Sequence, residues 1–350
     1  MNMKKTILAE LEKCYSIAPL NYKGKEHILV AAEKKNRCIL FTADGKEEAT
    51  VWEGPGGVMT MVQVPGTDGQ FLATHKFYSP NDSKEAKIII ATPDNKGNWE
   101  IQTLTDLPFV HRFDILQSGG KKYLIACTLK SGHTYKDDWS SPGKVYTAEL
   151  PDDLSGFNEE NQLQLEVLKE GMLKNHGYYR IIENSSMSSL ICSDNGVFRF
   201  YPPEKADGAW KEECLLNTPA SDAAMIDLDG DGELELVVLS PFHGDEISIY
   251  KKSGGSYNKV YEYPEKAEFL HAIWSGTLAG KPVVITGHRK GARRLFALLW
   301  TGKEYSFKTI DDDCGPANAY GYVCNGKDIL VTTNREINQI AMYTFEGGEF

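Results

Sequence analysis

The chain lacks an apolar run long enough to cross a bilayer, since segments such as KIIIAT and LELVVL have only the length of a β-strand. The opening MNMKKTILAELEKC also lacks the apolar core and the small-residue cleavage site of a signal peptide. No run rich in Lys and Arg is present, and 49 acidic against 38 basic residues give a net charge of -11. Because that charge repels a phosphate backbone, we expect neither nucleic acid nor a membrane as a partner.

Paired cysteines of the metal-binding or redox type are missing as well. The seven cysteines are odd in number, widely spread and free of CxxC spacing. Several lie inside apolar runs such as LIACTL and SLICSD, where a thiol packs as a small hydrophobic group. We therefore expect reduced thiols, mostly buried, in a cytoplasmic protein.

Glycine and aromatic residues are plentiful, and one short apolar segment recurs along the chain. Each copy follows a turn that contains Gly, Asn or Asp, with one apolar strand before the turn and further strands after the copy. Four strands in each of seven copies predict an all-β, seven-bladed β-propeller. The copies are HILVAA at 27, QFLATH at 70, KYLIAC at 122, SLICSD at 189, LELVVL at 234, PVVITG at 282 and DILVTT at 328.

We expect one domain over residues 1–350, with strands A to D in each blade running from the channel outward. The last copy lacks strand D, and residues 3–12 have no blade of their own. We predict that this N-terminal strand closes the last blade, which removes free sheet edges. The alternative is an amphipathic helix, because Ile7, Leu8 and Leu11 also fit a helical stripe. The predicted blades span residues 13–54, 55–106, 107–170, 174–218, 220–264, 267–311 and 315–346.

The segment AAMIDLDGDGELELVVL places acidic residues at alternating positions of the turn between strands A and B of the fifth blade. Gly230 and Gly232 permit the reversal, and several hard oxygen ligands suit Ca²⁺. An EF-hand is excluded because Val238 stands where the twelfth loop residue must be acidic. We predict a structural calcium site with the ligands Asp227, Asp229, Asp231, Glu233 (through its carbonyl) and Glu235.

This turn resembles the calcium turn of FG-GAP or VCBS repeats, which occur in integrin α-subunit propellers and in many bacterial propellers. The match is complete in one of the seven copies, and the Phe-Gly and Gly-Ala-Pro signatures are absent. The resemblance implies a propeller whose metal-bound turn is structural. It does not imply the interaction role of integrins.

Seven of the eight histidines fall at the start of a strand A or just after a strand B. In a propeller these positions share one face around the central channel. A single histidine there is usually an ordinary rim residue, but several imidazoles with neighbouring arginines suit anion or metal binding. We therefore predict that this face is a functional mouth.

The predicted roles divide the mouth into three groups. The catalytic candidates are His111, Arg112, His176, Tyr178 and Arg289, with His111 or His176 as the base. The substrate-binding candidates, which include residues of a long loop in the third blade, are His75, His133, Tyr135, Trp139 and Arg335. The candidate ligands of a transition metal, zinc or manganese, are His243, His271 and His288.

A histidine-lined propeller with such an acidic turn resembles aldos-2-ulose dehydratases and seven-bladed polysaccharide lyases. The resemblance implies a carbohydrate-active lyase or dehydratase that performs β-elimination on an oxidised sugar or uronate, often with a metal. The residues suit that chemistry, which needs a base and a cation that holds the enolate charge. A small-molecule carbohydrate or uronate is the expected partner. The alternative is a non-catalytic propeller that binds a glycan or a protein.

Overall fold

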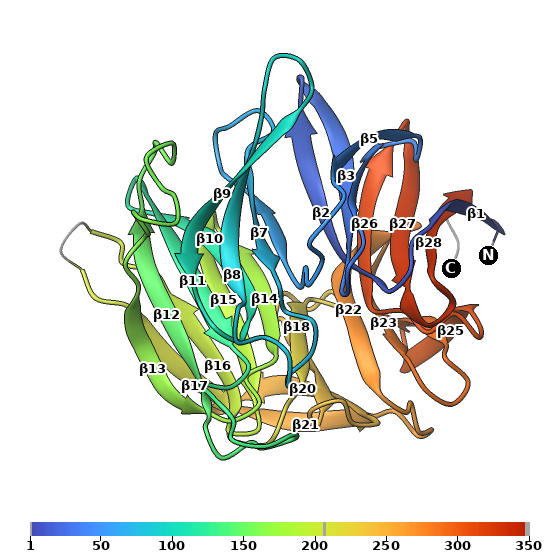
Figure 1. Ribbon diagram of the computed structural model, residues 1–350. Helices are drawn as coiled ribbons and strands as arrows, with labels where there is room; N and C mark the ends of the chain where they lie inside the picture. The colour runs from blue at the N-terminus through green and yellow to red at the C-terminus, as the bar shows by residue number, and fades with distance from the viewer. Residues whose placement is uncertain (1, 206–207, 347–350) are drawn as a thin grey trace.

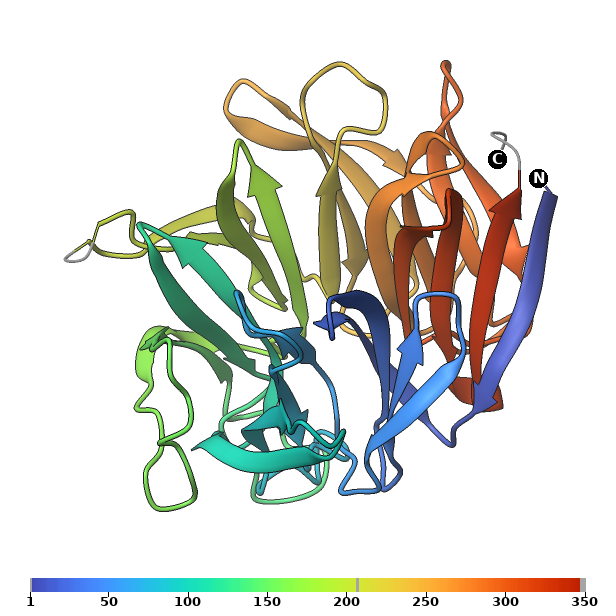
Figure 2. The same ribbon diagram turned by 90° about the horizontal axis from the view of Figure 1, so that it is seen from above.

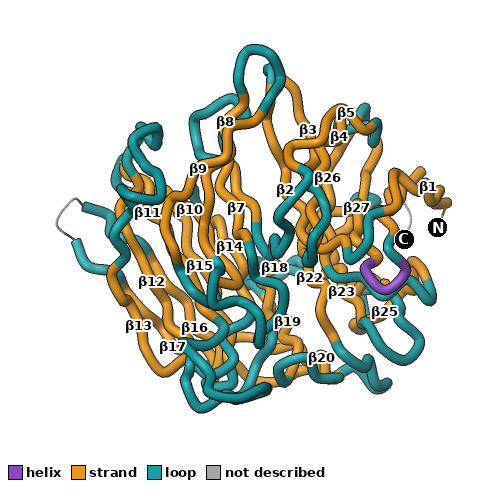
Figure 3. Tube along the Cα trace, viewed as in Figure 1, coloured by secondary structure: helices purple, strands orange, loops and turns teal. Residues whose placement is uncertain are grey.

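The computed structural model describes residues 2–205 and 208–346. These residues form seven four-stranded antiparallel sheets arranged in a ring, so the predicted seven-bladed β-propeller is confirmed (Figure 2). Within the described ranges, the single helical segment is a 3-10 turn at Arg335–Ile337, shown in purple in Figure 3. No helix of this described part is long and apolar enough to span a membrane.

The first four blades follow the chain in A to D order. Blade 1 contains β2 (Cys14–Tyr22), β3 (Lys25–Ala32), β4 (Cys38–Thr42) and β5 (Glu47–Trp52). Blade 2 contains β6 (Met61–Gln63), β7 (Phe71–His75), β8 (Lys87–Pro93) and β9 (Trp99–Asp106). Blade 3 contains β10 (Val110–Ser118), β11 (Lys121–Thr128), β12 (Gly143–Leu150) and β13 (Glu166–Met172). Blade 4 contains β14 (Gly177–Glu183), β15 (Ser186–Ser193), β16 (Gly196–Tyr201) and β17 (Lys211–Leu216).

The remaining blades keep this order, and the last one takes its outer strand from the N-terminus. Blade 5 contains β18 (Asp222–Ile226), β19 (Glu235–Ser240), β20 (Glu246–Ser253) and β21 (Ser256–Glu262). Blade 6 contains β22 (Leu270–Leu278), β23 (Lys281–His288), β24 (Leu295–Trp300) and β25 (Tyr305–Asp311). Blade 7 contains β26 (Asn318–Cys324), β27 (Lys327–Asn334), β28 (Gln339–Glu346) and β1 (Asn2–Glu10).

The ring is closed by the pairing of β1 with β28. The two strands are antiparallel, with Met3 opposite Phe345 and Ile7 opposite Ala341. They lie side by side at the edge of the ring in Figures 1 and 2. The predicted closing strand is therefore confirmed and the alternative N-terminal helix is excluded. Closure leaves blade 7 as complete as the other six.

The hydrophobic core lies between the blades and over the B and C strands. In β11, the six residues from Tyr123 to Thr128 are all buried, whereas β21 is exposed along most of its length. One apolar cluster joins Leu29 of blade 1 to Phe71 of blade 2. Full burial of such side chains contributes about 1.5–3 kcal/mol each. This packing between blades holds the A strands rigidly around the channel.

All seven cysteines are free thiols, and five of them are buried. Cys214 is exposed and Cys324 is half-buried, so the expectation of buried thiols holds for the other five.

Candidate active site in the central channel

The blades share one local geometry where each strand A begins. We call the residue just before the first regularly paired residue of strand A the ring position; in blade 2, where regular pairing begins one residue later, at Met61, the equivalent residue is Met59. A residue of positive φ stands two positions before it in six blades, for example Phe109 (64°) before His111 and Phe269 (64°) before His271. A left-handed residue reverses the chain sharply as it enters the strand. The ring positions are Tyr15, Met59, His111, His176, Ser221, His271 and Ala317.

In three blades the ring position is also a β-bulge. The pairing register shifts across Tyr15 in blade 1, across His111 in blade 3 and across His271 in blade 6. A bulge adds an unpaired residue and turns its side chain away from the direction that regular pairing would give. The same irregularity therefore brings a phenol and two imidazoles together at one level of the channel.

Each ring histidine donates its Nδ1 proton to the backbone of the next blade. His111 Nδ1 lies 3.1 Å from the His176 carbonyl oxygen. His271 Nδ1 lies 2.7 Å from the Ala317 carbonyl oxygen. His176 Nδ1 lies 2.9 Å from Asp222 Oδ2 and 3.3 Å from the Ser221 carbonyl oxygen. Carbonyl and carboxylate oxygens only accept, so Nδ1 carries the proton. In the neutral form of such a ring, the lone pair therefore lies on Nε2.

These lone pairs meet in a compact cluster that includes a histidine from outside the ring positions. Donor atoms of His176, His243 and His271 all lie within 4.8 Å of one another. The His111 ring stands 4.5 Å from the His176 ring, between centroids. The Tyr15 hydroxyl lies 2.9 Å from His271 Nε2. His176 Nε2 and His243 Nε2 are buried without a hydrogen-bond partner among the described residues.

His243 reaches the cluster from the connection between β19 and β20. It has a φ of 51°, and its ring stacks between Phe242 (3.9 Å) and Phe269 (4.2 Å). Two flanking aromatic faces fix the orientation of the imidazole. Phe242 also contacts His176, with 5.2 Å between the ring centroids.

Burial controls the charge of this cluster. It lowers the pKa of His111, His243 and His271 well below 6.5, and the nearby Arg289 guanidinium lowers the pKa of the last two further. These three imidazoles are therefore neutral at neutral pH. Burial also raises the pKa of Tyr15 to about 12, so its hydroxyl is protonated in this state.

A cavity of about 520 Å³ runs along the A strands from this cluster. At one end its lining includes buried Asp222 and His271, and at the other end it includes exposed Asn21 and Gln117 near the A–B turns. The cavity therefore opens at the A–B turns. The predicted mouth at the strand-A starts is corrected: His111 and His176 are only 3% and 1% exposed there. Neither of these two predicted bases belongs to the cavity lining, whereas His271 does.

Two arginines line the cavity, and they differ in whether a carboxylate neutralises them. Arg180 pairs with buried Asp114, with 2.7 Å between Nε and Oδ2. Arg112 donates from Nη1 to the Met59 carbonyl oxygen at 2.5 Å, and its guanidinium lies 5.8 Å from the Tyr15 ring centre. Among the described residues, no carboxylate lies within ion-pair distance of Arg112. It is the cation in this cavity that is left to receive an anionic ligand.

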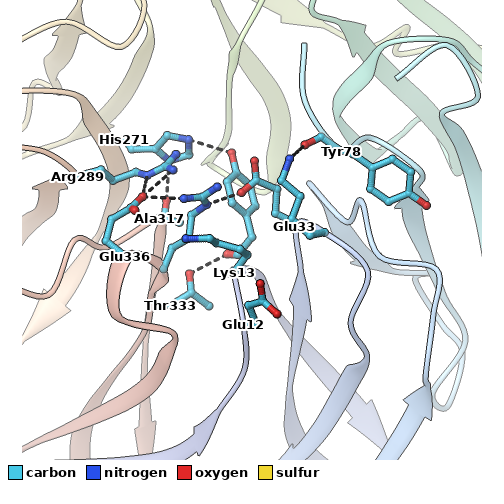
Figure 4. A network of polar contacts seen from close by, with 12 residues as sticks. Glu12, Lys13, Glu33, Tyr78, His271, Arg289, Ala317, Thr333 and Glu336 are labelled. Carbon is cyan, nitrogen blue, oxygen red and sulfur yellow. Dashed lines mark hydrogen bonds and ion pairs between the residues drawn. The ribbon is translucent and has the colours of Figure 1, made fainter. Parts of the chain in front are cut away.

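Of the other predicted catalytic residues, Tyr178 lines the cavity, and burial raises the pKa of its phenol. Arg289 does not line it. Its Nη2 lies 2.7 Å from Glu336 Oε1, and its guanidinium packs on Phe269. Figure 4 shows Arg289 and Glu336 beside His271. Arg289 acts on the site through its field and its packing.

Arg335, predicted to bind substrate, is 9% exposed and forms ion pairs between blades 1 and 7. It contacts Glu33 through Nε and Glu336 through Nη1, the latter at 2.8 Å. Because Glu336 also holds Arg289, the network joins blades 6, 7 and 1 across the closure of the ring (Figure 4).

The remaining predicted substrate-binding residues lie apart from the cavity. The rings of His75 and His133 pack against Trp52 and Phe109, with centroids 4.7 and 5.6 Å apart. Tyr135 is 66% exposed. Trp139 packs against Phe242 and the ammonium group of Lys130, at 5.5 and 4.1 Å.

His288 does not join the predicted metal ligands. Its Nδ1 donates to the Lys290 carbonyl oxygen at 2.8 Å, and its Nε2 accepts from the Arg294 N–H at 3.2 Å. Both nitrogens are thus used within one hairpin, and no lone pair is left for a metal. His176 takes the place of His288 in the cluster.

In the acidic turn of blade 5, the carboxylates are paired with the ammonium group of a lysine of the same chain. Lys251 Nζ lies 2.6 Å from Asp229 Oδ2, 2.5 Å from Asp231 Oδ2 and 3.2 Å from Glu235 Oε1. Asp227 accepts the Gly230 and Gly232 N–H groups, at 2.7 and 2.9 Å. Oxygens of Asp227, Asp229 and Glu235 lie within 4.8 Å of one another. The side chain of Glu233 is exposed. A calcium ion here would compete with the ammonium group.

Two contributors to the site had weak sequence signals. Tyr15 occupies the same repeat position as the histidines, so aligning the strand-A starts by register would have found it. Asp222 directly follows a ring position, but its contact with His176 crosses 46 residues of chain. No local sequence pattern predicts that contact.

Comparison with known proteins gives a likeness of fold only. No family model matches the chain, and no curated protein matches it. The resemblance to FG-GAP or VCBS repeats is thus not confirmed. Among solved structures, a streptogramin B lyase is similar, with a TM-score of 0.56 and 12% identity over 98% of both chains. At that identity the similarity shows a shared propeller architecture.

Proposed function

We propose that the chain is a carbon–oxygen lyase that performs β-elimination on an oxidised sugar or uronate in the channel cavity. The observation that carries the proposal is the cavity itself, whose lining includes the unpaired Arg112 and, at the closed end, His271, the hydrogen-bond partner of Tyr15. The similar solved propeller is named a lyase, which supports the reaction class by analogy of fold.

The shape of the cavity restricts the substrate. Its volume of about 520 Å³ lies within the range of about 300–1,000 Å³ found for small-molecule sites. Because buried His111, His176 and His271 close one end, a polymer cannot thread through. We therefore expect a monosaccharide derivative or the terminal residue of a short oligomer.

Arg112 is the group proposed to bind the anionic end of the substrate. Its planar fork matches a carboxylate, and no competing carboxylate occupies it among the described residues. As the α-proton leaves, negative charge moves onto the carboxylate or carbonyl oxygen. A guanidinium already in place stabilises that charge without reorganising.

Tyr15 is the group proposed to transfer the proton at the closed end. In the elimination, the α-carbon gives up a proton, the β-carbon–oxygen bond breaks with its electron pair on the oxygen, and that oxygen is protonated. The Tyr15 hydroxyl is oriented by His271 Nε2 at 2.9 Å, and Arg112 lies over its ring. The phenolate form of Tyr15, which the neighbouring Arg112 charge favours, accepts the α-proton, and the phenol so formed returns that proton to the leaving oxygen.

A substrate panel tests the proposal. Short oligouronides, monomeric uronates and keto-sugars are incubated with the protein, and ultraviolet absorbance of an unsaturated product is followed. We expect a product from at least one of them, and strong loss of its formation in Tyr15→Phe. Tyr135→Ala is the matched control, since Tyr135 is exposed and lies apart from the cavity.

The non-catalytic alternative gives a different result. If the panel yields no product while a sugar binds equally well to the native chain and to Tyr15→Phe, the lyase proposal is overturned. The propeller is then a binding module.

A further inference from the structure

We propose that His176, His243 and His271 form a binding site for one divalent transition-metal cation of the zinc type, at the closed end of the cavity. The role of the cation in catalysis rests on the proposed lyase activity, but its binding does not. The ligand set differs from the one expected from the sequence, because His176 replaces His288.

The first argument is the protonation pattern. A metal needs the lone pair of a neutral imidazole. In His176 and His271, the Nδ1 proton is fixed by Asp222 and by the Ala317 carbonyl oxygen, which leaves Nε2 as the ligating atom. In His271 the cation would take the place of the Tyr15 hydroxyl, a side-chain partner that can turn away. Histidine ligands of metals almost always donate their other N–H to a carboxylate or a backbone carbonyl. Both supporting groups are present here.

The second argument is the cost of leaving these nitrogens unpaired. His176 is 1% exposed, and its Nε2 has no partner among the described residues, like Nε2 of His243. A buried unsatisfied polar group costs about 1–3 kcal/mol. Two buried nitrogens without partners, in a cluster whose candidate ligand atoms lie within 4.8 Å of one another, are explained by a cation between the rings.

The third argument is distance. The three donor atoms lie within 4.8 Å of one another. Tetrahedral zinc with Zn–N bonds of about 2.0–2.1 Å needs about 3.4 Å between nitrogens. Small inward rotations of the rings bridge the difference.

Ligand chemistry selects the metal. Three imidazoles suit Zn²⁺, Co²⁺, Ni²⁺ or Cu²⁺, whereas Mn²⁺ and Mg²⁺ prefer oxygen. Of the two metals expected from the sequence, zinc therefore fits and manganese does not. Three protein ligands also leave a fourth position open, as in catalytic zinc sites.

The open position relates to the cavity through His271, which belongs to both the cluster and the lining. A cation on His271 Nε2 replaces the hydrogen bond from Tyr15, so the Tyr15 hydroxyl becomes free at the closed end. When bound, the cation would supply a Lewis acid for the enolate oxygen. Arg112 and the cation would then hold the two ends of a carboxylate or hydroxy-carbonyl group.

Metal binding is measured directly on the full chain, freed of any affinity tag and stripped with a chelator. The chain is titrated with Zn²⁺ and with Co²⁺, and bound metal is counted by mass spectrometry. We expect one Zn²⁺ per chain. Co²⁺ should give the intense visible absorption of a four- or five-coordinate site.

Variants separate this site from adventitious binding. His176→Ala and His243→Ala should lose the bound zinc and the cobalt spectrum, whereas His288→Ala should keep both. Asp222→Asn should weaken zinc affinity about 10–100-fold, as loss of a supporting carboxylate does. Circular dichroism checks that each variant is folded. A chain that binds less than one zinc, or a His176→Ala variant that is folded and binds as well as the native chain, overturns the inference.

The outcomes distinguish this inference from the proposed function. A chain that binds zinc with the expected variant pattern but eliminates no substrate keeps the metal site and loses the lyase. A chain that is fully active after chelation keeps the lyase and overturns the catalytic role of the cation, whereas the zinc count of the native chain and its variants decides the binding site itself.

Discussion

Asp222 Oδ2 accepts a hydrogen bond from His176 Nδ1 at 2.9 Å, and both residues are almost completely buried. The contact joins blades 4 and 5 beside the channel. Asp222 also lines the cavity, so one carboxylate links the wall of the cavity to the histidine cluster.

The first prediction concerns the stability of this contact. Asp222→Ala leaves the buried Nδ1–H of His176 without its carboxylate, which should cost about 1–3 kcal/mol of unfolding free energy. Asp222→Asn keeps an acceptor oxygen of the same shape and should cost less. Chemical denaturation measures both variants. Equal losses in the two would contradict a specific role for the acceptor, and Asp312→Ala, at an exposed position, is the control.

The second prediction concerns Arg112. Arg112→Met removes the unpaired guanidinium of the cavity and should lower kcat/KM about 100- to 1,000-fold on the substrate found in the panel, because a charge-stabilising donor is lost. Arg112→Lys should recover part of that loss. Steady-state kinetics with circular dichroism as the folding check decide this. A Met variant with unchanged kcat/KM would remove Arg112 from the site.

The architecture was accessible from the sequence, and the reason is local. Alternation of apolar residues and glycine turns repeats in each blade, and each hairpin forms from neighbouring residues. The ring closure was also predictable from the sequence, because the last copy lacks a fourth strand and residues 3–12 belong to no other blade. Their positions in the repeat also placed four histidines on one face, and the rings of these histidines do contact one another: His111, His176, His243 and His271.

The site itself was only partly predictable, because it depends on where each side chain points and on which residues form hydrogen bonds or ion pairs with it. His288 sits at the end of β23 as expected, but the hairpin beyond it turns back and uses both ring nitrogens. Arg289 and Arg335 stand on the correct face, but Glu336 neutralises both. Which end of the cavity is closed follows from the packing that buries Asp222 and His271. No repeat pattern encodes that packing.

The third prediction concerns the ion-pair network at the ring closure. Arg335→Met leaves Glu33 without its buried partner and Glu336 with Arg289 alone, so we expect a loss of about 3 kcal/mol, in the range for breaking buried pairs. Combining Arg335→Met with Glu33→Gln should recover part of the loss. A double-mutant cycle by urea denaturation measures the coupling. Strictly additive losses would show that Arg335 and Glu33 do not interact.

The fourth prediction concerns the acidic turn of blade 5. Lys251→Met removes the ammonium group among Asp229, Asp231 and Glu235, so these carboxylates should repel one another and the melting temperature should fall. Calcium should then restore stability, with an affinity at least about tenfold higher than in the native chain, because it no longer displaces a cation. Melting with calcium or EDTA, plus calorimetry, measures this. A variant indifferent to both would argue against a calcium site.

The last prediction concerns pH and His75. Burial lowers the pKa of His75 to about 3, against 6.5 in the unfolded chain. The unfolded chain therefore takes up a proton first as pH falls, and native stability decreases between pH 6.5 and about 3, by up to about 1.4 kcal/mol per pH unit from this group. In His75→Gln that contribution is absent, so the stability difference from the native chain should shrink as pH falls from 7 to 5. Denaturant titrations at each pH test this, with Tyr135→Ala as the control. A difference that stays constant across this interval would show that His75 does not titrate as a buried neutral imidazole.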